Sequence, residues 1–371
     1  MDLRPVNALA RTAILAMAWL MASQATRAHE LELTEVHVSF SNDGRFTIDV
    51  MNDPGWLLMR VEPFSGLGLS GRLDPPARDR RLTEMEATFA EWVHLYFDGT
   101  RADVKVAYRS PSAEGPAAAD GTSLGVMRLV GQVPEGASTF SFAYGLIMDP
   151  YPLLIRDRGD DVITYWNVGE FETEPFRLGD LTPPTRLQVI RTYLQLGFTH
   201  IVPKGLDHIL FVIGIFMLGT RLTPILAQVT TFTIAHTFTL GLSMFGLVSL
   251  PANIVEPLIA LSIVYVAVEN LVTSDLKPWR LSLVFGFGLL HGLGFAGVLS
   301  ELGVPRDEFV PALMSFNLGV EGGQLAVIAA LFVALGWARH TRWYRRVAVV
   351  PISLGVATIG VYWTVTRVVS G

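Results

Sequence analysis

Long apolar runs separated by short polar joints fill residues 206–368 of this 371-residue chain. Soluble domains do not sustain such runs, whereas a transmembrane helix needs about 20 consecutive, mostly apolar residues. We therefore expect a membrane protein whose carboxy-terminal part is an α-helical bundle of about six transmembrane helices in a lipid bilayer. The expected spans cover approximately 206–220, 224–247, 253–273, 281–301, 308–336 and 347–367.

A shorter apolar stretch stands at the amino terminus. Arg4 and Arg11 precede the apolar residues 13–21, and small residues follow up to Ala28. A basic segment, a short apolar segment and a small-residue cleavage site are typical of a secretory signal peptide. We predict a signal peptide over residues 1–28; the alternative, an uncleaved first helix, would be too short to span a bilayer comfortably.

Residues 29–184 are mixed and polar, and apolar residues alternate with polar ones in several places. Two alternating runs flank the turn signal Asn42-Asp43-Gly44, which is typical of a β-hairpin. A short helix is expected over 83–95, because its apolar residues recur at helical spacing. Further strands are expected over 103–108, 125–131, 138–144 and 161–168. This pattern predicts a β-rich, sandwich-like extracytoplasmic domain ahead of a transmembrane domain over 185–371.

The segment from Thr185 to Ile201 is expected to be an amphipathic helix at the membrane interface. The loops between the spans indicate the topology. If residues 29–184 are exported, every second loop faces the cytoplasm, and basic residues collect in those loops as the positive-inside rule requires. They are Arg221, Lys277, Arg280, Arg339, Arg342, Arg345 and Arg346. We therefore predict a bacterial inner (cytoplasmic) membrane protein with a periplasmic amino-terminal domain, for which a periplasmic partner is conceivable.

Ionisable and amide side chains interrupt the apolar spans, although a charged residue at the bilayer centre costs about 2.5–3.5 kcal/mol. They lie at three levels: near the outer surface, near the middle and near the cytoplasmic side. In that order they are Asp207, His208 and Glu256; His236, His291, Asn317 and Glu321; and Glu269. Such a series indicates a path for an ion, and the alternative is a set of hydrogen bonds between helices.

The chain contains no cysteine, so thiolate metal sites and cysteine nucleophiles are excluded. Imidazole and carboxylate ligands suit a divalent first-row metal such as Ni²⁺, Co²⁺ or Zn²⁺. The net charge of −6 and the lack of a basic stripe argue against a nucleic-acid partner.

Several of these motifs resemble the HupE/UreJ family of nickel permeases or accessory proteins of nickel enzymes. The resemblance covers roughly residues 197–336 and rests on His200-Ile201-Val202-Pro203-Lys204-Gly205-Leu206-Asp207-His208, Ala235-His236, Val255-Glu256, Phe287-Gly288-Leu289-Leu290-His291-Gly292 and Asn317-Leu318-Gly319-Val320-Glu321. The gap from His200 to Asp207 holds six residues instead of the five in shorter members, and the large outer domain is typical of a distinct branch. With the resemblance, the candidate metal ligands are His200, Asp207, His208, His236, Glu256, His291, Asn317 and Glu321.

A second metal site is conceivable at the mature amino terminus. Cleavage after Ala28 would give His29 an α-amine beside its imidazole, and His37 could supply another nitrogen. Nitrogen ligands suit Cu²⁺ or Ni²⁺. The alternative is that His29 stands there by chance.

The leading hypothesis is a secondary transporter for a divalent metal, with Ni²⁺ first and Co²⁺, Zn²⁺ or Cu²⁺ as alternatives. No Walker A pattern occurs, so ATP hydrolysis by this chain is not expected. One alternative is an intramembrane zinc hydrolase with His208, His236 and His291 as ligands, although no His-Glu-x-x-His motif is present. Another is a sensor or assembly accessory whose helices serve as an anchor.

Overall fold

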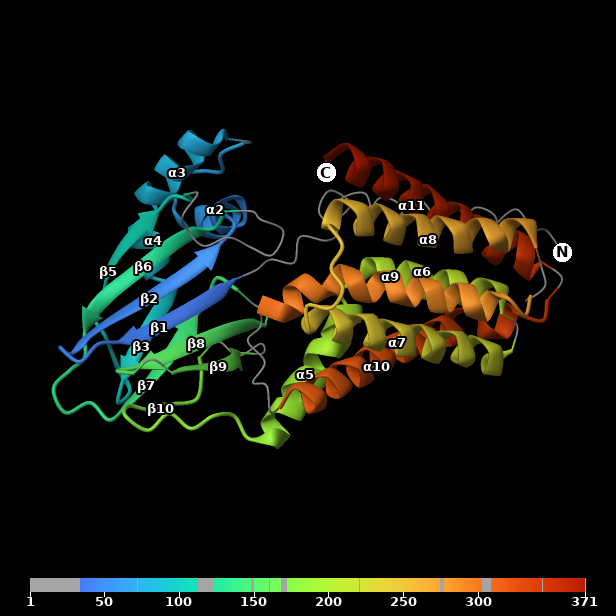
Figure 1. Cartoon of the computed structure of the whole chain (residues 1–371). Helices are drawn as coiled ribbons and strands as arrows, with labels where there is room; N and C mark the ends of the chain where they lie inside the picture. The colour runs from blue at the N-terminus through green and yellow to red at the C-terminus, as the bar shows by residue number, and fades with distance from the viewer. Residues whose placement is uncertain are drawn as a thin grey trace. The chain divides into compact units, whose positions relative to one another are not determined.

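A computed structural model describes residues 34–71, 73–112, 123–147, 150–159, 161–167, 172–219, 221–273, 277–301, 308–341 and 343–370. The expected signal peptide and His29 lie outside these residues. The chain divides into two compact units, one within residues 31–188 and the other made of 189–300 and 305–371. Figure 1 shows strands in the first unit and long helices in the second.

The amino-terminal unit contains two β-sheets. The larger sheet has the strand order β5-β6-β2-β1-β8-β9, and the smaller has the order β10-β7-β3-β4. The larger sheet consists of β1 (Glu35–Phe40), β2 (Arg45–Asn52), β5 (Lys105–Arg109), β6 (Gly125–Gln132), β8 (Tyr151–Asp157) and β9 (Val162–Asn167). The smaller consists of β3 (Val93–Phe97), β4 (Thr100–Arg101), β7 (Thr139–Tyr144) and β10 (Phe176–Arg177). Strands β1 and β2 form the expected antiparallel hairpin, whereas β1 and β8 are parallel.

The core of this unit lies between the two sheets. In β1 every second residue is buried, as the two-residue period of a half-buried strand requires. The ring of Phe40 lies 6.3 Å from the ring of Phe97 and 4.7 Å from that of Phe140, both on the smaller sheet. The unit is therefore β-rich, as the alternation predicts, and its two sheets share one apolar core.

Three short helices accompany the sheets: α2 (Pro54–Val61), α3 (Pro75–Glu84) and α4 (Glu86–Ala90). An aspartate caps the start of α2 and another caps the start of α3, each with proline in the first turn. The single helix expected over 83–95 is only partly right. Helix α4 ends at Ala90, and β3 follows, because Val93, Leu95 and Phe97 alternate toward the core with the period of a strand.

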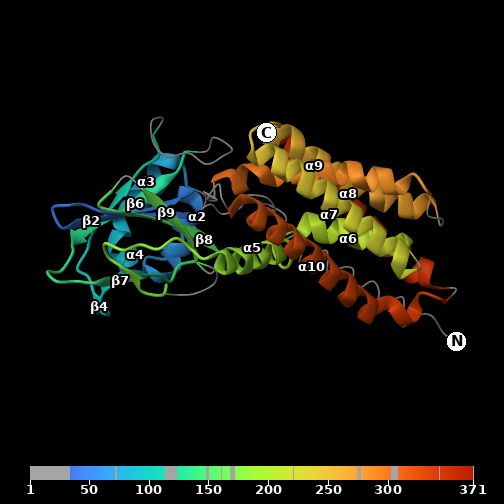
Figure 2. The same cartoon turned by 60° about the horizontal axis from the view of Figure 1, so that its bottom comes forward.

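The carboxy-terminal unit is helical, as Figure 2 shows from a second direction. Its α-helices are α5 (Arg186–Ile201), α6 (Leu206–Leu218), α7 (Leu222–Met244), α8 (Ala252–Val272), α9 (Arg280–Glu301), α10 (Phe309–Leu335) and α11 (Val350–Ser370). Four segments of the described chain are long and apolar enough to cross a membrane: 222–244, 252–272, 309–338 and 345–369. Helices α5 and α6 meet at an angle of 69° and are apolar enough only as a pair, which forms either a broken fifth span or a re-entrant loop. A sixth full span stays a prediction, since Arg280–Gly294 of α9 counts only as a shorter apolar helix.

Glycines allow the helices of this unit to approach closely. A Cβ atom at Gly292 of α9 would lie 2.5 Å from the carbonyl oxygen of His236 on α7. A Cβ at Gly319 of α10 would overlap the backbone of α5 at Leu194. Small residues at such crossings are typical of membrane bundles, where close backbone packing replaces hydrophobic driving force.

Helix α5 packs on one side and leaves the expected apolar face outward. Its apolar residues Leu187, Ile190, Leu194 and Phe198 are exposed. The buried positions are Val189, Tyr193, Gly197 and Ile201. The helix faces α10 through Gly197, where a Cβ atom would overlap the carbonyl of Phe316. The exposed apolar face is thus available to lipid, and α5 is an integral part of the helical unit.

Candidate metal centre

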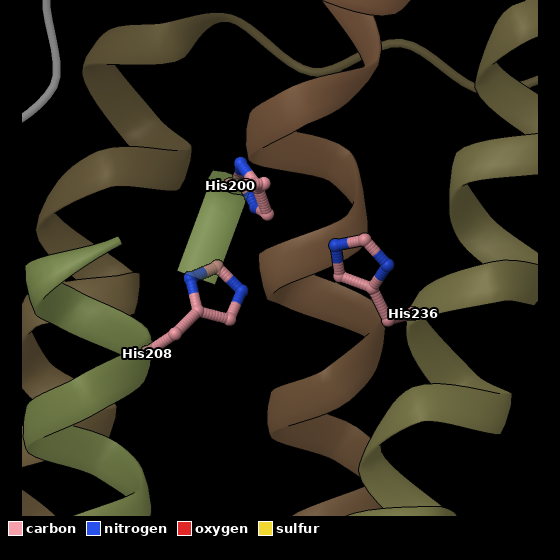
Figure 3. A group of neighbouring side chains, drawn as sticks. All are labelled: His200, His208 and His236. Atoms are coloured by element: carbon pink, nitrogen blue, oxygen red, sulfur yellow. The ribbon is translucent and has the colours of Figure 1, made fainter. Parts of the chain in front are cut away.

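Four histidines from four different helices converge inside the helical unit. His200 ends α5, His208 lies in the first turn of α6, His236 is in α7 and His291 is in α9. The ring of His208 is central: its centroid lies 4.8 Å from His200, 5.9 Å from His236 and 4.8 Å from His291. Figure 3 shows three of these rings grouped around one space between their helices.

Two groups of ligand atoms result from this convergence. In one, a nitrogen from each of His200, His208 and His236 lies within 4.8 Å of the other two. In the other, an oxygen of Asp207 and a nitrogen from each of His208 and His291 meet the same limit. We call these the imidazole triad and the carboxylate triad. They share His208, so the two groups form one continuous cluster.

The break between α5 and α6 brings His200 and His208 together. Helix α5 ends at Ile201 and α6 begins at Leu206, and the chain bends by 69° between them. Proline at position 203 cannot continue an α-helix. A Cβ atom at Gly205 would overlap the carbonyl of His200, so the close turn requires glycine there. Residues eight apart therefore face each other instead of following one helix surface.

Asp207 fixes the orientation of His208. One carboxylate oxygen of Asp207 lies 3.0 Å from Nδ1 of His208 and 2.8 Å from its backbone nitrogen. An ionised carboxylate only accepts hydrogen bonds, so Nδ1 carries the proton and Nε2 carries the lone pair. Among the residues that the structure describes, Nε2 of His208 is buried and has no hydrogen-bond partner. A carboxylate behind an imidazole is the usual second-shell support of a metal-binding histidine.

Asn317 fixes the orientation of His236. The side-chain nitrogen of Asn317 donates to the carbonyl of Leu313 at 2.8 Å, which leaves its oxygen 3.0 Å from Nδ1 of His236. With the amide so assigned, Nδ1 donates and Nε2 carries the lone pair. Within the described residues, Nε2 of His236 is likewise buried without a hydrogen-bond partner. Two imidazole lone pairs thus lie inside the bundle.

A serine orients His291. The hydroxyl of Ser262 on α8 donates to the carbonyl of Ile259 at 2.7 Å and lies 3.1 Å from Nε2 of His291. A hydroxyl has one proton, so Nε2 donates to the serine oxygen and Nδ1 keeps the lone pair. The sequence analysis did not identify Ser262; a lone serine in an apolar span is too common to stand out.

Aromatic rings surround the cluster. Phe232 lies 4.9 Å from the ring of His291 and 5.7 Å from that of His208, and Phe211 lies 5.4 Å from His291. Phe316 lies 5.6 Å from His200. These rings exclude water, which makes unpaired polar atoms costly and strengthens their interaction with a cation.

The other expected ligands are Glu256, Glu321 and Asn317. Glu256 is 3.8 Å from a guanidinium nitrogen of Arg367 on α11, and Glu321 accepts from Thr230 at 2.6 Å. Neither belongs to the two triads found among the described residues. Asn317 contacts His236, a member of the imidazole triad, through Nδ1.

Glu269, expected near the cytoplasmic end of the path, lies in a buried polar network. Its carboxylate accepts from Arg280 at 2.7 Å, and Arg280 also donates to Gln228 at 2.8 Å. This network joins α7, α8 and α9. Gln228 was not identified from the sequence, because a single glutamine near a helix end gives no signal of its partner.

The site proposed at the mature amino terminus is described only in part. His37 lies in β1 with its Nε2 atom 3.2 Å from the Glu35 carboxylate. His29 lies outside the described residues.

A model of the family described as "HupE / UreJ protein" matches residues 181–367, which is half of the chain and includes all four clustered histidines. No curated protein and no solved structure matches the chain. The match implies handling of a metal ion, as a permease or in an accessory role.

Proposed function

The chain belongs to the HupE/UreJ family, and we propose that it is a secondary transporter for a divalent transition metal ion, with Ni²⁺ as the first expected substrate. One observation carries this proposal. The Nε2 atoms of His208 and His236 are both buried without a hydrogen-bond partner among the described residues, and second-shell groups aim both of them. Such atoms are costly unless a ligand engages them.

The donor set favours borderline metal ions over hard ones. The imidazole triad offers three neutral nitrogens, which suit Ni²⁺, Co²⁺, Cu²⁺ and Zn²⁺ and not Mg²⁺ or Ca²⁺. The carboxylate triad adds one negative charge from Asp207 beside His208 and His291. The charge of a divalent cation is therefore partly neutralised in the carboxylate triad and is not neutralised in the imidazole triad.

Sharing of His208 supports movement of one ion between the triads. An ion held by His200, His208 and His236 is bound through Nε2 of His208, so its transfer to Asp207 and His291 requires the Asp207 carboxylate to release Nδ1 and the ring of His208 to turn. Stepwise exchange lowers the barrier, because the ion is never stripped of all its ligands. Each imidazole binds only in its neutral form, so release of the ion can be coupled to protonation.

The hydrolase alternative needs a general base beside its histidine ligands. The sequence offers Glu321 or Glu256 as that base, but neither belongs to the two triads found among the described residues: Glu256 pairs with Arg367, and Glu321 accepts from Thr230. The carboxylate within the triads, Asp207, accepts from Nδ1 of His208. An accessory role without transport is the coarser reading that the family allows, and flux measurements separate the two.

The proposal includes the expected membrane and orientation. The chain would lie in a bacterial inner membrane with its amino-terminal unit in the periplasm, and ions would move inward. The basic residues of the alternate loops support this orientation.

The test is metal uptake by purified protein in proteoliposomes. We expect uptake of Ni²⁺, measured against Co²⁺, Zn²⁺ and Cu²⁺, to be lost in His236→Ala and His291→Ala. The matched control is His340→Ala, since His340 is an exposed histidine of the same unit. Tightly held zinc with no flux of any ion would instead support the hydrolase, and equal uptake by all variants would refute a path through the cluster.

A further inference from the structure

The amino-terminal unit carries an exposed apolar loop that follows α2. Over residues 34–177, six large apolar side chains are exposed in the described chain, and four of them lie within residues 59–69. They are Met59 at 50 %, Phe64 at 52 %, Leu67 at 57 % and Leu69 at 77 % exposure. Scattered exposed leucines need no explanation, but a cluster on one short segment marks an interaction surface.

The loop is held in place by polar contacts beneath it. Glu62 is buried and its carboxylate accepts hydrogen bonds from Arg81 at 3.1 Å and from the Ser70 hydroxyl. Arg81 also donates to the carbonyls of Leu67 and Gly68, at 3.3 and 3.0 Å. These bonds tie the loop to α3 and leave the leucine side chains pointing outward. A loop that packed only against its own unit would bury these leucine side chains.

Its composition suits contact with lipid. Residues 63–71 contain no ionisable side chain, so no charge must be dehydrated when the loop enters an apolar layer. Gly66 and Gly68 have positive φ angles of 69° and 75°, which shape the tip that presents Leu67. Arg80 is exposed on the adjoining α3, and a cation beside the loop is attracted to anionic headgroups.

The position of the loop within its own unit also supports contact with lipid. Helix α2 follows the end of β2, where Met51 pairs with Glu35 at the start of β1. After β10 the chain returns toward this end: Tyr165, which pairs with Leu153, donates to the carbonyl of Thr182 at 2.6 Å. Three residues, 183–185, separate Thr182 from the start of α5 at Arg186, so the four steps reach about 14 Å at 3.3–3.6 Å per residue.

We propose that the loop of residues 63–71 inserts into the surface of the bilayer in which the helical unit lies. The short connection to α5 keeps the bilayer at a high effective concentration, so even a small apolar patch can bind it. This argument favours lipid over a separate protein partner, which would have to be recruited from solution. The proposal does not depend on metal transport.

The absence of cysteine from the sequence makes the test direct. Leu67→Cys and Leu69→Cys, each labelled with an environment-sensitive fluorophore, are reconstituted as the full chain in nanodiscs of phosphatidylcholine and phosphatidylglycerol. The matched control is Val162→Cys, an exposed valine at the far end of β9, where Val162 pairs with Arg156. A second set of nanodiscs contains lipids with a nitroxide near the headgroup.

We expect blue-shifted emission from both loop labels and loss of most of their fluorescence in nitroxide lipid, while the Val162 label stays water-exposed and unquenched. Water-like emission from the loop labels would overturn the proposal. Blue-shifted emission without quenching would also overturn it, because the loop would then be buried against protein. Both leucines are exposed, so labelling should leave the fold intact, and the thermal unfolding midpoint of each variant checks this.

Discussion

The Nδ1 atom of His236 lies 3.0 Å from the side-chain oxygen of Asn317, across the contact between α7 and α10. The amide is fixed by its own bond to Leu313, so it selects the tautomer in which Nε2 of His236 has the lone pair. Asn317, which the sequence presents as a candidate ligand, thus orients the candidate ligand His236.

Replacing Asn317 by Leu should weaken metal binding without unfolding the bundle. Loss of a second-shell partner typically costs about 10–100-fold in metal affinity, and we expect a Kd for Ni²⁺ raised to that extent in titration calorimetry. The control is Gln324→Leu, which removes a comparable bond, from Thr233 at 3.0 Å, on the same helix. Equal Kd values for Asn317→Leu and the wild type would contradict the orienting role.

The shared position of His208 predicts one ion per chain. An ion in one triad occupies the imidazole that the other triad needs, so both cannot be filled through Nε2 of His208 at once. Metal analysis of protein equilibrated with excess Ni²⁺ and then desalted should give one equivalent. Two equivalents in the wild type, with one lost in His291→Ala and one in His236→Ala, would show independent sites.

The glycine at position 292 should be irreplaceable for reasons of space. A methyl group there would overlap the Thr239 hydroxyl and crowd the His236 carbonyl, and it would push α9 and its His291 away from α7. Overpacking typically costs about 1–3 kcal/mol, so Gly292→Ala should lower both the unfolding midpoint and uptake. Gly286→Ala on the same helix is the control, because nothing lies within 4 Å of its Cβ position. Unchanged uptake in Gly292→Ala would contradict this packing.

The ion pair of Glu269 and Arg280 is expected to stabilise the fold. Removing one partner of a buried pair leaves an uncompensated charge, which costs about 3–5 kcal/mol. Arg280→Met should therefore lower the thermal midpoint in detergent sharply, and the double variant Glu269→Gln/Arg280→Met should lose less. If Glu269→Gln abolished uptake while keeping the midpoint, Glu269 would be a transport residue, as its depth in the span indicated.

The loop of the amino-terminal unit should loosen in acid. Burial raises the pKa of Glu62, but the hydrogen bonds from Ser70 and Arg81 outweigh it and hold the pKa below the ordinary value of 4.5. A lowered pKa contributes stability above 4.5 that is lost as the pH falls through the folded-state value. Hydrogen exchange of residues 62–71, corrected for intrinsic rates, should increase below that pH. In Glu62→Gln the exchange should be fast both above and below pH 4.5. A loop that stays protected in this variant would show that the carboxylate does not hold it.

The sequence predicts much of the fold because it shows clearly the two-residue period of strands, the 3.6-residue period of helices and the length of transmembrane spans. The hairpin of β1 and β2 follows from alternation around a turn, and α7, α8 and α10 lie within three residues of the expected spans. Local pattern was insufficient where two periods compete, as between α4 and β3. Strand β8, which pairs in parallel with β1 far away in the sequence, has no local signal of its partner.

The candidate site could be predicted only in part, because hydropathy gives the depth of a residue and not the rotation of its helix. His236 and His291 were expected at one depth, and the structure brings both within 6 Å of His208. Glu256 and Glu321 lie in the neighbouring spans α8 and α10, where they face Arg367 and Thr230. His200 joins the cluster because of the bend between α5 and α6. That bend could not be predicted without knowing the turn at Gly205.

The most direct test of the account is Ni²⁺ uptake by His208→Ala in proteoliposomes, because His208 belongs to both triads. The variant is compared with His340→Ala at equal protein incorporation and equal unfolding midpoint. We predict that His208→Ala takes up no more Ni²⁺ than empty liposomes, while His340→Ala matches the wild type. Wild-type uptake by a folded His208→Ala protein would contradict an ion path through this cluster.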